Sequence, residues 1–284
     1  MTTQQAVWII GGYQSDFARN FTKESLDISD LVRETATGTL AAAGISTEQV
    51  QVIHVANAMG ELYVKQAHLG SMVASVVPGL SGAPATRHEA ACASGGVAVM
   101  AAMADLESGR YDVALVIGVE IERNVPGSIG AGYLASAAWV GHEGEGQDYV
   151  WPFTFSRIAE EYDRRYGLQD GHLRSIAAQN IANARTNPKA QTRSWATPPE
   201  CFTDDDDALA EQADTGAALD QALGDVAAGD LAGLGVVEEL PDFGVAEVGL
   251  AGLRCALALA RIFEFVTVTG ADGVLSQVGA FALG

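Results

Sequence analysis

Cys92 is the residue whose surroundings most favour chemistry. It lies in Glu89-Ala-Ala-Cys-Ala-Ser-Gly-Gly96, between a segment predicted to be extended and one predicted to be helical. At such a corner the first backbone N–H groups and the positive end of the helix dipole stabilise a thiolate, the nucleophilic form of cysteine. Ser94 can donate a hydrogen bond, and Gly95 lets a ligand or another backbone approach closely. A buried structural cysteine is the alternative, but the corner favours covalent acyl transfer through a thioester.

The base that would activate this thiol is not evident among the five histidines. His88 precedes the cysteine by four residues, and His142 lies in a glycine-rich stretch, so either could take part. His54 falls inside a predicted strand, where a packed or edge position is expected. His68 and His172 are predicted to lie on helix surfaces. The sequence therefore predicts a nucleophile without identifying its proton acceptor.

Neither the remaining cysteines nor the densest acidic run indicates a metal site. Cys201 and Cys255 are too scattered for a disulfide framework, and no Cys-x-x-Cys spacing suggests zinc. The run at 204–207 is four aspartates, without the spaced partners and glycine turn of a calcium loop. We expect no metal, and a solvated loop at the aspartates that could mark a domain boundary.

The composition is that of a globular protein, and it excludes several classes of partner. Hydrophobic residues make up 48% of the 284 residues, which argues against disorder. The net charge of −20 disfavours nucleic-acid binding, which relies on Lys and Arg, and it also disfavours anionic membranes. No apolar run approaches the ~18 residues of a membrane span, and the N-terminus lacks the pattern of a signal peptide. We expect a cytoplasmic protein.

Strand and helix patterns alternate over the first part of the chain, which predicts an α/β fold. The apolar run at 6–12 is expected to be a central strand buried on both faces. In the helix predicted at 92–108, apolar residues such as Met100 and Met103 leave almost no polar face, so burial all round is expected. Gly44 is the expected C-terminal cap of a helix. Further strands are predicted at 50–57, 85–91 and 111–118, and further helices at 29–43 and 65–77.

The remainder of the chain is predicted to be mainly helical, after a region without a clear period. Residues 124–150 are rich in Gly, Ala and Ser and are expected to form a functional loop region. Two amphipathic helices are predicted at 155–166 and 172–185, with Ile158 and Ile176 among their inward-facing residues. Beyond the aspartate run, helices are predicted at 217–228 and 245–259, and strands at 236–239 and 262–269.

The residues around Cys92 resemble those of a known family. Ala90-Ala-Cys-Ala-Ser-Gly-Gly96 resembles the nucleophile motif of thiolases, particularly the sterol-carrier-protein type. Tyr111-Asp-Val-Ala-Leu-Val-Ile-Gly-Val-Glu120 resembles the strand that follows the nucleophile helix in that family. Pro152-Phe-Thr-Phe-Ser-Arg-Ile-Ala159 resembles the beginning of its lid segment. The matches follow in family order and cover roughly residues 5–207.

The resemblance implies a thiolase-like layered αβαβα fold whose second half is truncated or divergent. Residues 1–207 would form the N-terminal-type domain, with a lid-like segment at about 124–200, and residues 208–284 a shortened C-terminal-type domain. It also implies an acyltransferase in which Cys92 takes an acyl group from coenzyme A and passes it to a second thiol or an acyl-CoA carbanion. Coenzyme A and acyl-CoA would be substrates, with no covalently bound cofactor. A homodimer is implied as well.

Coenzyme A carries phosphates, so its binding to so acidic a chain would depend on local cations. Arg157 and Arg193 of the lid-like segment are candidates, together with Ser94 and Gly95 beside the nucleophile. The same cations could equally serve to solubilise two surface helices. Other cations of this group are Arg164, Arg165 and Lys189.

The second half departs from the family pattern, which places further catalytic residues there in an Asn/His-Glu/Asp-x-Phe loop, a Gly-His-Pro loop and a second cysteine. Leu234-Gly-Val-Val-Glu-Glu-Leu-Pro-Asp-Phe243 is similar to the first loop but has Leu240-Pro241 at its polar position. No histidine follows His172, and Cys255 lies in an apolar helix pattern. A degenerate acyl-CoA-binding or assembly subunit is therefore an alternative, as is an enzyme completed by a partner subunit. A carbon–carbon lyase with an oligonucleotide-binding-fold partner is a third alternative, which the retained Cys92 disfavours.

Overall fold

The structure is a computed structural model that describes residues 6–195 and 279–283. The chain divides into two compact units, one formed by Met1–Val125 with Val266–Gly284 and the other by Pro126–Phe265. The elements predicted at 217–228, 236–239, 245–259 and 262–269 lie outside the described residues.

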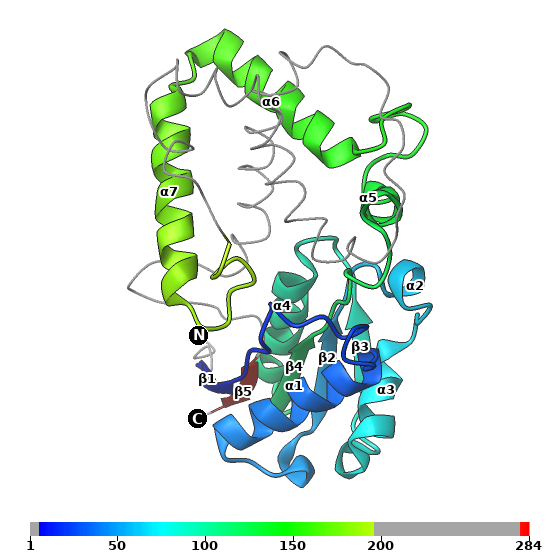
Figure 1. Ribbon diagram of the computed structural model, residues 1–284. Helices are drawn as coiled ribbons and strands as arrows, with labels where there is room; N and C mark the ends of the chain where they lie inside the picture. The colour runs from blue at the N-terminus through cyan, green and yellow to red at the C-terminus, as the bar shows by residue number, and fades with distance from the viewer. Residues whose placement is uncertain (1–5, 196–278, 284) are drawn as a thin grey trace. The chain divides into compact units, whose positions relative to one another are not determined.

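A five-stranded mixed sheet organises the first unit (Figure 1). Its strands are β1 (Val7–Gly12), β2 (Val52–Ala56), β3 (Ala85–His88), β4 (Val113–Gly118) and β5 (Gly279–Leu283). They lie in the order β1-β5-β4-β2-β3. β2 is parallel to β3 and β4, whereas β5 is antiparallel to β1 and β4. The carboxyl ends of the three parallel strands therefore meet at one edge of the sheet.

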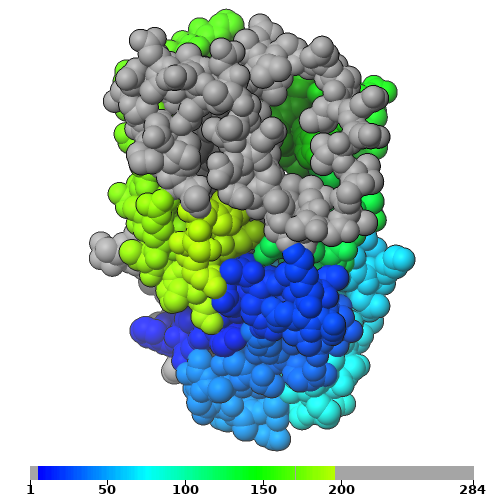
Figure 2. Space-filling model, viewed as in Figure 1, coloured from blue at the N-terminus to red at the C-terminus, as the bar shows by residue number. Residues whose placement is uncertain are grey.

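Helices cover both faces of this sheet (Figure 1). The helices of this unit are α1 (Ile28–Ala43), the single turn α2 (Gly60–Tyr63), α3 (Leu69–Val76) and α4 (Ser94–Glu107), with 3₁₀ turns at Thr47–Gln49 and Pro78–Leu80. α1 and α3 lie against one face and α4 against the other. In Figure 2 the N-terminal segment and α1 (blue) form much of the visible surface of this unit, with the segment of α2 and α3 (cyan) beside them.

The core has two parts because successive side chains of a buried strand point to opposite faces. Ile53 and Leu115 belong to the cluster beneath α1 and α3, whereas Val52 and Ala114 belong to the cluster beneath α4. β2 is buried along its whole length. These strands confirm the predicted α/β fold, and Gly44, with φ +67°, caps α1 as predicted.

The expectation that α4 is buried all round is wrong. Its buried side chains, Ser94, Ala98, Ala102 and Leu106, recur at every fourth residue and form one stripe. Met100 lies away from that stripe and is 70% exposed. Both sides of the helix are apolar, but three of the four buried side chains are small, which lets the helix approach the sheet closely. The apolar composition of α4 therefore did not show which face is buried.

The expectation that the first strand is central is also wrong. β1 forms an edge of the described sheet, where β5 is its partner. Trp8 and Ile9 are more than half exposed. An apolar run is typical of a strand buried on both faces, but the described residues leave this edge strand partly uncovered.

The second unit is helical in the described residues. Its helices are α5 (Gly127–Ala135), α6 (Val150–Tyr166) and α7 (Asp170–Thr186). The last two confirm the predicted helices, whereas α5 lies within the stretch that was expected to be a loop. The Trp151 indole N–H donates to the Leu134 carbonyl at 2.8 Å, which ties α6 to α5.

Two residues of the second unit are not where the helical pattern placed them. Ile158 and Ile176, expected to face inward, are 57% and 45% exposed. The described residues leave those helix faces uncovered, so an amphipathic pattern alone overestimated their burial. Within the described ranges, no helix has both the length and the apolarity needed to cross a membrane.

Candidate active site

Cys92 lies near the carboxyl ends of the parallel strands, in the turn between β3 and α4. Its side chain is exposed. The helix begins two residues later, and the N–H groups of its first turn have no partners within the helix. Gly95 and Gly96 lie in that turn, where an added side chain would meet no described atom within 4 Å. An exposed thiol therefore stands beside open space at the positive end of a helix dipole.

Hydrogen bonds hold the turn that carries this thiol. The buried Ser94 hydroxyl accepts from the Ala90 N–H at 2.9 Å and donates to the Ala91 carbonyl at 2.7 Å. The Glu89 carboxylate accepts from the Ala91 N–H at 2.6 Å. Ala91 has a φ of +49°, a left-handed conformation that is rare for non-glycine residues. These bonds offset the strain of a sharp strand-to-helix corner, and the role of Ser94 in coenzyme A binding stays a prediction.

Asn57 and Glu120 form a second polar group at the same strand ends. Asn57 directly follows β2, and its amide donates to the Val119 carbonyl at 2.8 Å and to the Glu120 carboxylate at 2.9 Å. The other Glu120 oxygen accepts from the Ala58 N–H at 2.7 Å. Burial raises the pKa of Glu120, and these hydrogen bonds act in the opposite direction. The pair fixes the chain where it leaves β2 and β4.

Arg87 supports this network from β3. Its guanidinium donates to the carbonyls of Asn57 at 3.3 Å, Ala58 at 3.1 Å and Ala67 at 3.2 Å, and it pairs with Glu61. The Arg87 side chain is only 12% exposed. The same charge favours the ionised form of Glu120. One arginine thus joins β3 to the segment after β2.

Glu122 is a second acid beyond β4 and has a shifted pKa. Burial raises its pKa to about 7, and the neighbouring Glu120 carboxylate acts in the same direction. A carboxyl that exchanges its proton near neutral pH, at the edge of the sheet that carries an exposed thiol, can act as an acid or a base.

The structure brings two of the five histidines together. His54, on β2, is buried as expected, and its Nδ1 lies 2.9 Å from His88 Nε2 at the end of β3. His68 and His172 are exposed on or beside helices, as predicted. His142, in the second unit, is exposed and stacks on Trp139 with ring centroids 3.9 Å apart. The part taken by His88 or His142 in catalysis stays a prediction.

The candidate coenzyme A cations lie in the second unit. Arg157 is exposed and pairs with Glu160 at 2.8 Å, one helical turn away. Arg193 donates to the Ala190 carbonyl at 2.7 Å. Arg164 and Arg165 both pair with Glu161. The glutamates compensate the charges of Arg157, Arg164 and Arg165 locally. Phosphate binding by Arg157 or Arg193 stays a prediction.

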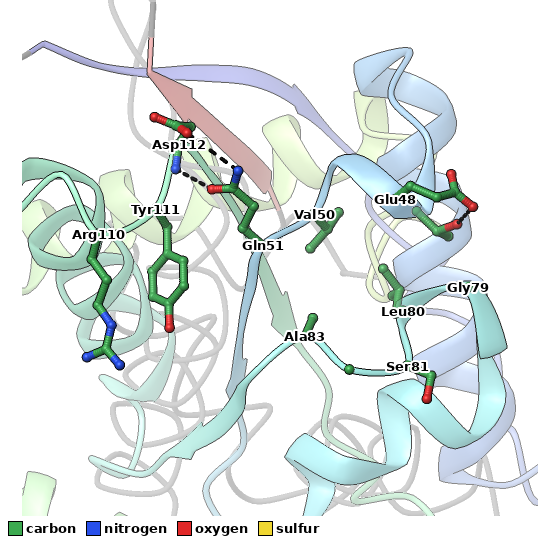
Figure 3. Close-up of a pocket in the computed structure, with 12 residues that line it drawn as sticks. Glu48, Val50, Gln51, Gly79, Leu80, Ser81, Ala83, Arg110, Tyr111 and Asp112 are labelled. Carbon is green, nitrogen blue, oxygen red and sulfur yellow. Dashed lines mark hydrogen bonds between the residues drawn. The ribbon is translucent and has the colours of Figure 1, made fainter.

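An open pocket lies at the amino ends of the parallel strands, opposite the Cys92 edge (Figure 3). Gln51 and Asp112, which directly precede β2 and β4, lie side by side among its lining residues. The Asp112 N–H donates to the Gln51 amide oxygen at 2.5 Å. Since Cys92 does not line this pocket, it is separate from the candidate active site. Across the described ranges, no group of three or more His, Cys, Asp or Glu side chains is placed to hold a metal ion.

Residues 7–223 match the family model described as "Thiolase, N-terminal domain". The chain belongs to the thiolase family. This match, which covers more than half of the chain, confirms the family suggested by the sequence around Cys92 and the thiolase-like α/β fold that it implied.

The thiolase family members most similar to this chain include acetyl-CoA acetyltransferases. That of Methanothermobacter thermautotrophicus is 31% identical over 188 residues, which are 65% of this chain and 46% of that protein. The acetyl-CoA acetyltransferase of Methanocaldococcus jannaschii is 33% identical over 188 residues, which are 65% of this chain and 45% of that protein. Sterol carrier protein 2 of Gallus gallus is 25% identical over 66% of this chain and 34% of its own length. The structure of an acetyl-CoA acetyltransferase from Syntrophomonas wolfei matches with a TM-score of 0.46 and 18% identity, over 64% of this chain and 48% of that one. The chain thus spans about half the length, or less, of the curated relatives it matches.

Within this thiolase-family chain, sequence reasoning missed Asn57, Arg87 and Glu122 as members of the site. A usable signal was present for Asn57, which directly follows the buried apolar strand β2, whereas Arg87 lies within β3 and Glu122 lies four residues beyond β4. In a parallel sheet such positions share one edge, where α/β proteins bind ligands.

Glu122 gives this thiolase-family chain a predictable pH dependence. The folded carboxyl keeps its proton up to about pH 7, whereas the unfolded one loses it near its ordinary pKa of 4.5. Between these pH values the folded state binds more protons than the unfolded state. The contribution of Glu122 to the free energy of unfolding therefore falls as pH rises. Relative to Glu122→Gln, the wild-type protein should lose about 2 kcal/mol of unfolding free energy between pH 5 and 8, as measured by urea titration. Glu145→Gln, at an exposed site, is the control and should keep the wild-type slope; a Glu122→Gln slope equal to wild type would contradict the assignment.

Proposed function

We propose that the chain is an acyl-CoA thiolase-type acyltransferase in which Cys92 carries the acyl group as a thioester. The observation that carries this proposal is the exposed thiol at the start of α4, in a turn held by Ser94. Acetyl-CoA acetyltransferases among the relatives support coenzyme A thioesters as the substrates.

The proposed step is an exchange of one thioester for another. The Cys92 thiolate attacks the carbonyl carbon of acyl-CoA, and the tetrahedral oxyanion accepts hydrogen bonds from backbone N–H groups of the turn or first helical turn. The bond from carbonyl carbon to the coenzyme A sulfur then breaks, and that sulfur leaves as a thiolate that takes a proton. In the second half-reaction a thiol or an acyl-CoA carbanion attacks the new thioester and frees Cys92.

The test is the formation of an acyl adduct. The intact mass of the protein is measured after incubation with acetyl-CoA and with longer acyl-CoAs, and the adduct is located by peptide mapping. We expect one acyl group on Cys92, released by hydroxylamine and absent from Cys92→Ala. Cys201→Ala and Cys255→Ala are matched controls that should keep the adduct.

The alternative is an acyl-CoA-binding or assembly subunit without turnover. It is favoured by one observation, that Leu240-Pro241 occupies the position where the family's first C-terminal loop has its polar catalytic residue. Binding of acyl-CoA by calorimetry, unchanged in Cys92→Ala and without an adduct at any chain length, would overturn the enzymatic proposal in favour of this one. The homodimer, the partner subunit that completes the site, and the cytoplasmic location stay predictions.

A further inference from the structure

Three polar side chains form a row between the sheet and α4. His54 Nδ1 lies 2.9 Å from His88 Nε2, and the two rings stack with centroids 5.1 Å apart and planes at 25°. On the other side, His54 Nε2 lies 3.4 Å from Asp105 Oδ2. The His54 side chain is 4% exposed and that of Asp105 33%. The row thus begins at the edge of α4, crosses the apolar core beneath it and ends at the last residue of β3.

The contacts determine where the protons are placed. A carboxylate only accepts hydrogen bonds, so the His54 nitrogen that faces Asp105 must be Nε2–H. His54 Nδ1 is then an acceptor, and His88 must donate to it from Nε2–H. The opposite arrangement would turn a bare Nε2 lone pair toward the Asp105 carboxylate. That nitrogen has no well-aligned hydrogen bond in the described part of the chain, so such a placement would leave a buried acceptor against an acceptor.

Both rings are favoured in the neutral form that this arrangement needs. Burial lowers the pKa of His54, and the neighbouring His88 lowers it further, whereas Asp105 acts in the opposite direction. Burial also lowers the pKa of His88, again opposed by Asp105. Among the residues that the structure describes, the titratable groups that act on the two rings are each other and Asp105, from β2, β3 and α4. At neutral pH each ring carries one N–H proton, and the neighbouring contacts decide whether it is on Nδ1 or on Nε2.

His88 connects this row to the candidate nucleophile. It is the last residue of β3, and its carbonyl accepts from the Asn57 N–H at 3.2 Å. The turn with Cys92 begins at the next residue. Ser94 holds the helical end of that turn through its hydroxyl. His88 holds the strand end, because its ring contacts His54 and its carbonyl accepts from Asn57.

We propose that Asp105, His54 and His88 form a polar relay, through the 3.4 Å contact of Asp105 with His54 and the hydrogen bond between the two rings. This relay sets both rings as Nε2–H tautomers and makes His88 a positioning residue for the Cys92 turn. Asp105 and His54 act through His88. In metal sites, residues that hydrogen-bond to a metal-ligating histidine orient its ring in the same way. The acceptor nitrogen left over in the relay is Nδ1 of His88. The inference rests on the proposed function only in treating Cys92 as the reacting residue.

Ring nitrogen NMR of the full chain tests the tautomers directly. At neutral pH the ¹⁵N shifts of a histidine ring separate Nε2–H, Nδ1–H and doubly protonated forms. The signals are assigned with His54→Asn and His88→Asn, and His68→Asn is the control for an exposed histidine. We expect both relay rings as Nε2–H tautomers. An Nδ1–H tautomer or a rapidly exchanging mixture at either ring overturns the relay.

The positioning role is tested at Asp105. Asp105→Ala removes the acceptor and should give His54 mixed tautomers, whereas Asp105→Asn keeps an acceptor oxygen and should preserve them. Alkylation of Cys92 by iodoacetamide, followed by peptide mass spectrometry, should slow on the order of threefold to tenfold in Asp105→Ala and stay near wild type in Asp105→Asn. The circular dichroism of all three proteins is compared, because a loss of folded structure would change that signal as well as the Cys92 rate. Equal Cys92 rates in all three proteins overturn the positioning role.

These readouts separate the relay from the proposed function. If wild-type protein forms no acyl adduct but shows the two Nε2–H tautomers and the slowed Cys92 alkylation, the function fails and the relay holds. If the adduct forms while the tautomers differ, the relay fails and the function holds.

Discussion

Arg87→Ala is expected to lower the free energy of unfolding by about 2–4 kcal/mol. The nearly buried guanidinium donates to the carbonyls of Asn57, Ala58 and Ala67, and its removal takes this donor away from all three. It also removes the positive charge that favours the ionised form of buried Glu120. The midpoint and slope of urea unfolding, followed by circular dichroism, measure the change.

Two variants define what the Arg87 result means. Arg33 pairs with Asp30 on the surface of α1 and is 50% exposed, so Arg33→Ala should cost about 0.5 kcal/mol or less. Glu61→Gln removes the exposed partner of Arg87 while leaving the carbonyl contacts, and should cost about 1 kcal/mol or less. If Glu61→Gln destabilises as much as Arg87→Ala, the surface ion pair and not the carbonyl contacts accounts for the effect.

Leu106→Ala is expected to cost about 2.5–5 kcal/mol, the range for removing a fully buried leucine side chain. Leu106 has no exposed surface and packs with Val52 and Ala114 in the cluster beneath α4. Because this cluster holds the helix that begins beside Cys92, the rate of Cys92 alkylation should change together with stability. Chemical unfolding gives the first quantity and peptide mass spectrometry the second.

Met100→Ala is the matched control on the same helix. Met100 is 70% exposed, so its truncation should change the unfolding free energy by about 0.5 kcal/mol or less. A loss similar to that of Leu106→Ala would mean that this face of α4 is covered in solution, and would contradict the one-sided burial.

Local patterns in the sequence predicted the elements that depend on neighbouring residues. The apolar run before Gly118 predicted the buried parallel strand β4, and Gly44 predicted the end of α1. The corner at Cys92 was predicted because small residues separate an extended segment from a helix. In each case a few consecutive residues decide the conformation.

The polar networks could not be predicted in this way because they depend on register. The contact of His54 with His88 requires β2 and β3 to pair so that Ala56 lies beside His88. The bond from Asn57 to Glu120 joins residues 63 positions apart. Such distances in sequence carry no local signal, and only the order of the strands in the sheet brings the partners together.

The position of β5 has a consequence for how the first unit folds. The strands β3, β2 and β4 lie within one stretch of the chain, so their pairing closes loops of modest length. β5 separates β1 from β4, and its pairing joins Val7 to Leu283 across nearly the whole sequence. Contacts so distant in sequence form slowly, because the entropy of a long loop is lost before they stabilise the chain. During synthesis the three parallel strands can therefore assemble first, together with α4 and the Cys92 turn. β1 can join the sheet only after residues 279–283 have been made.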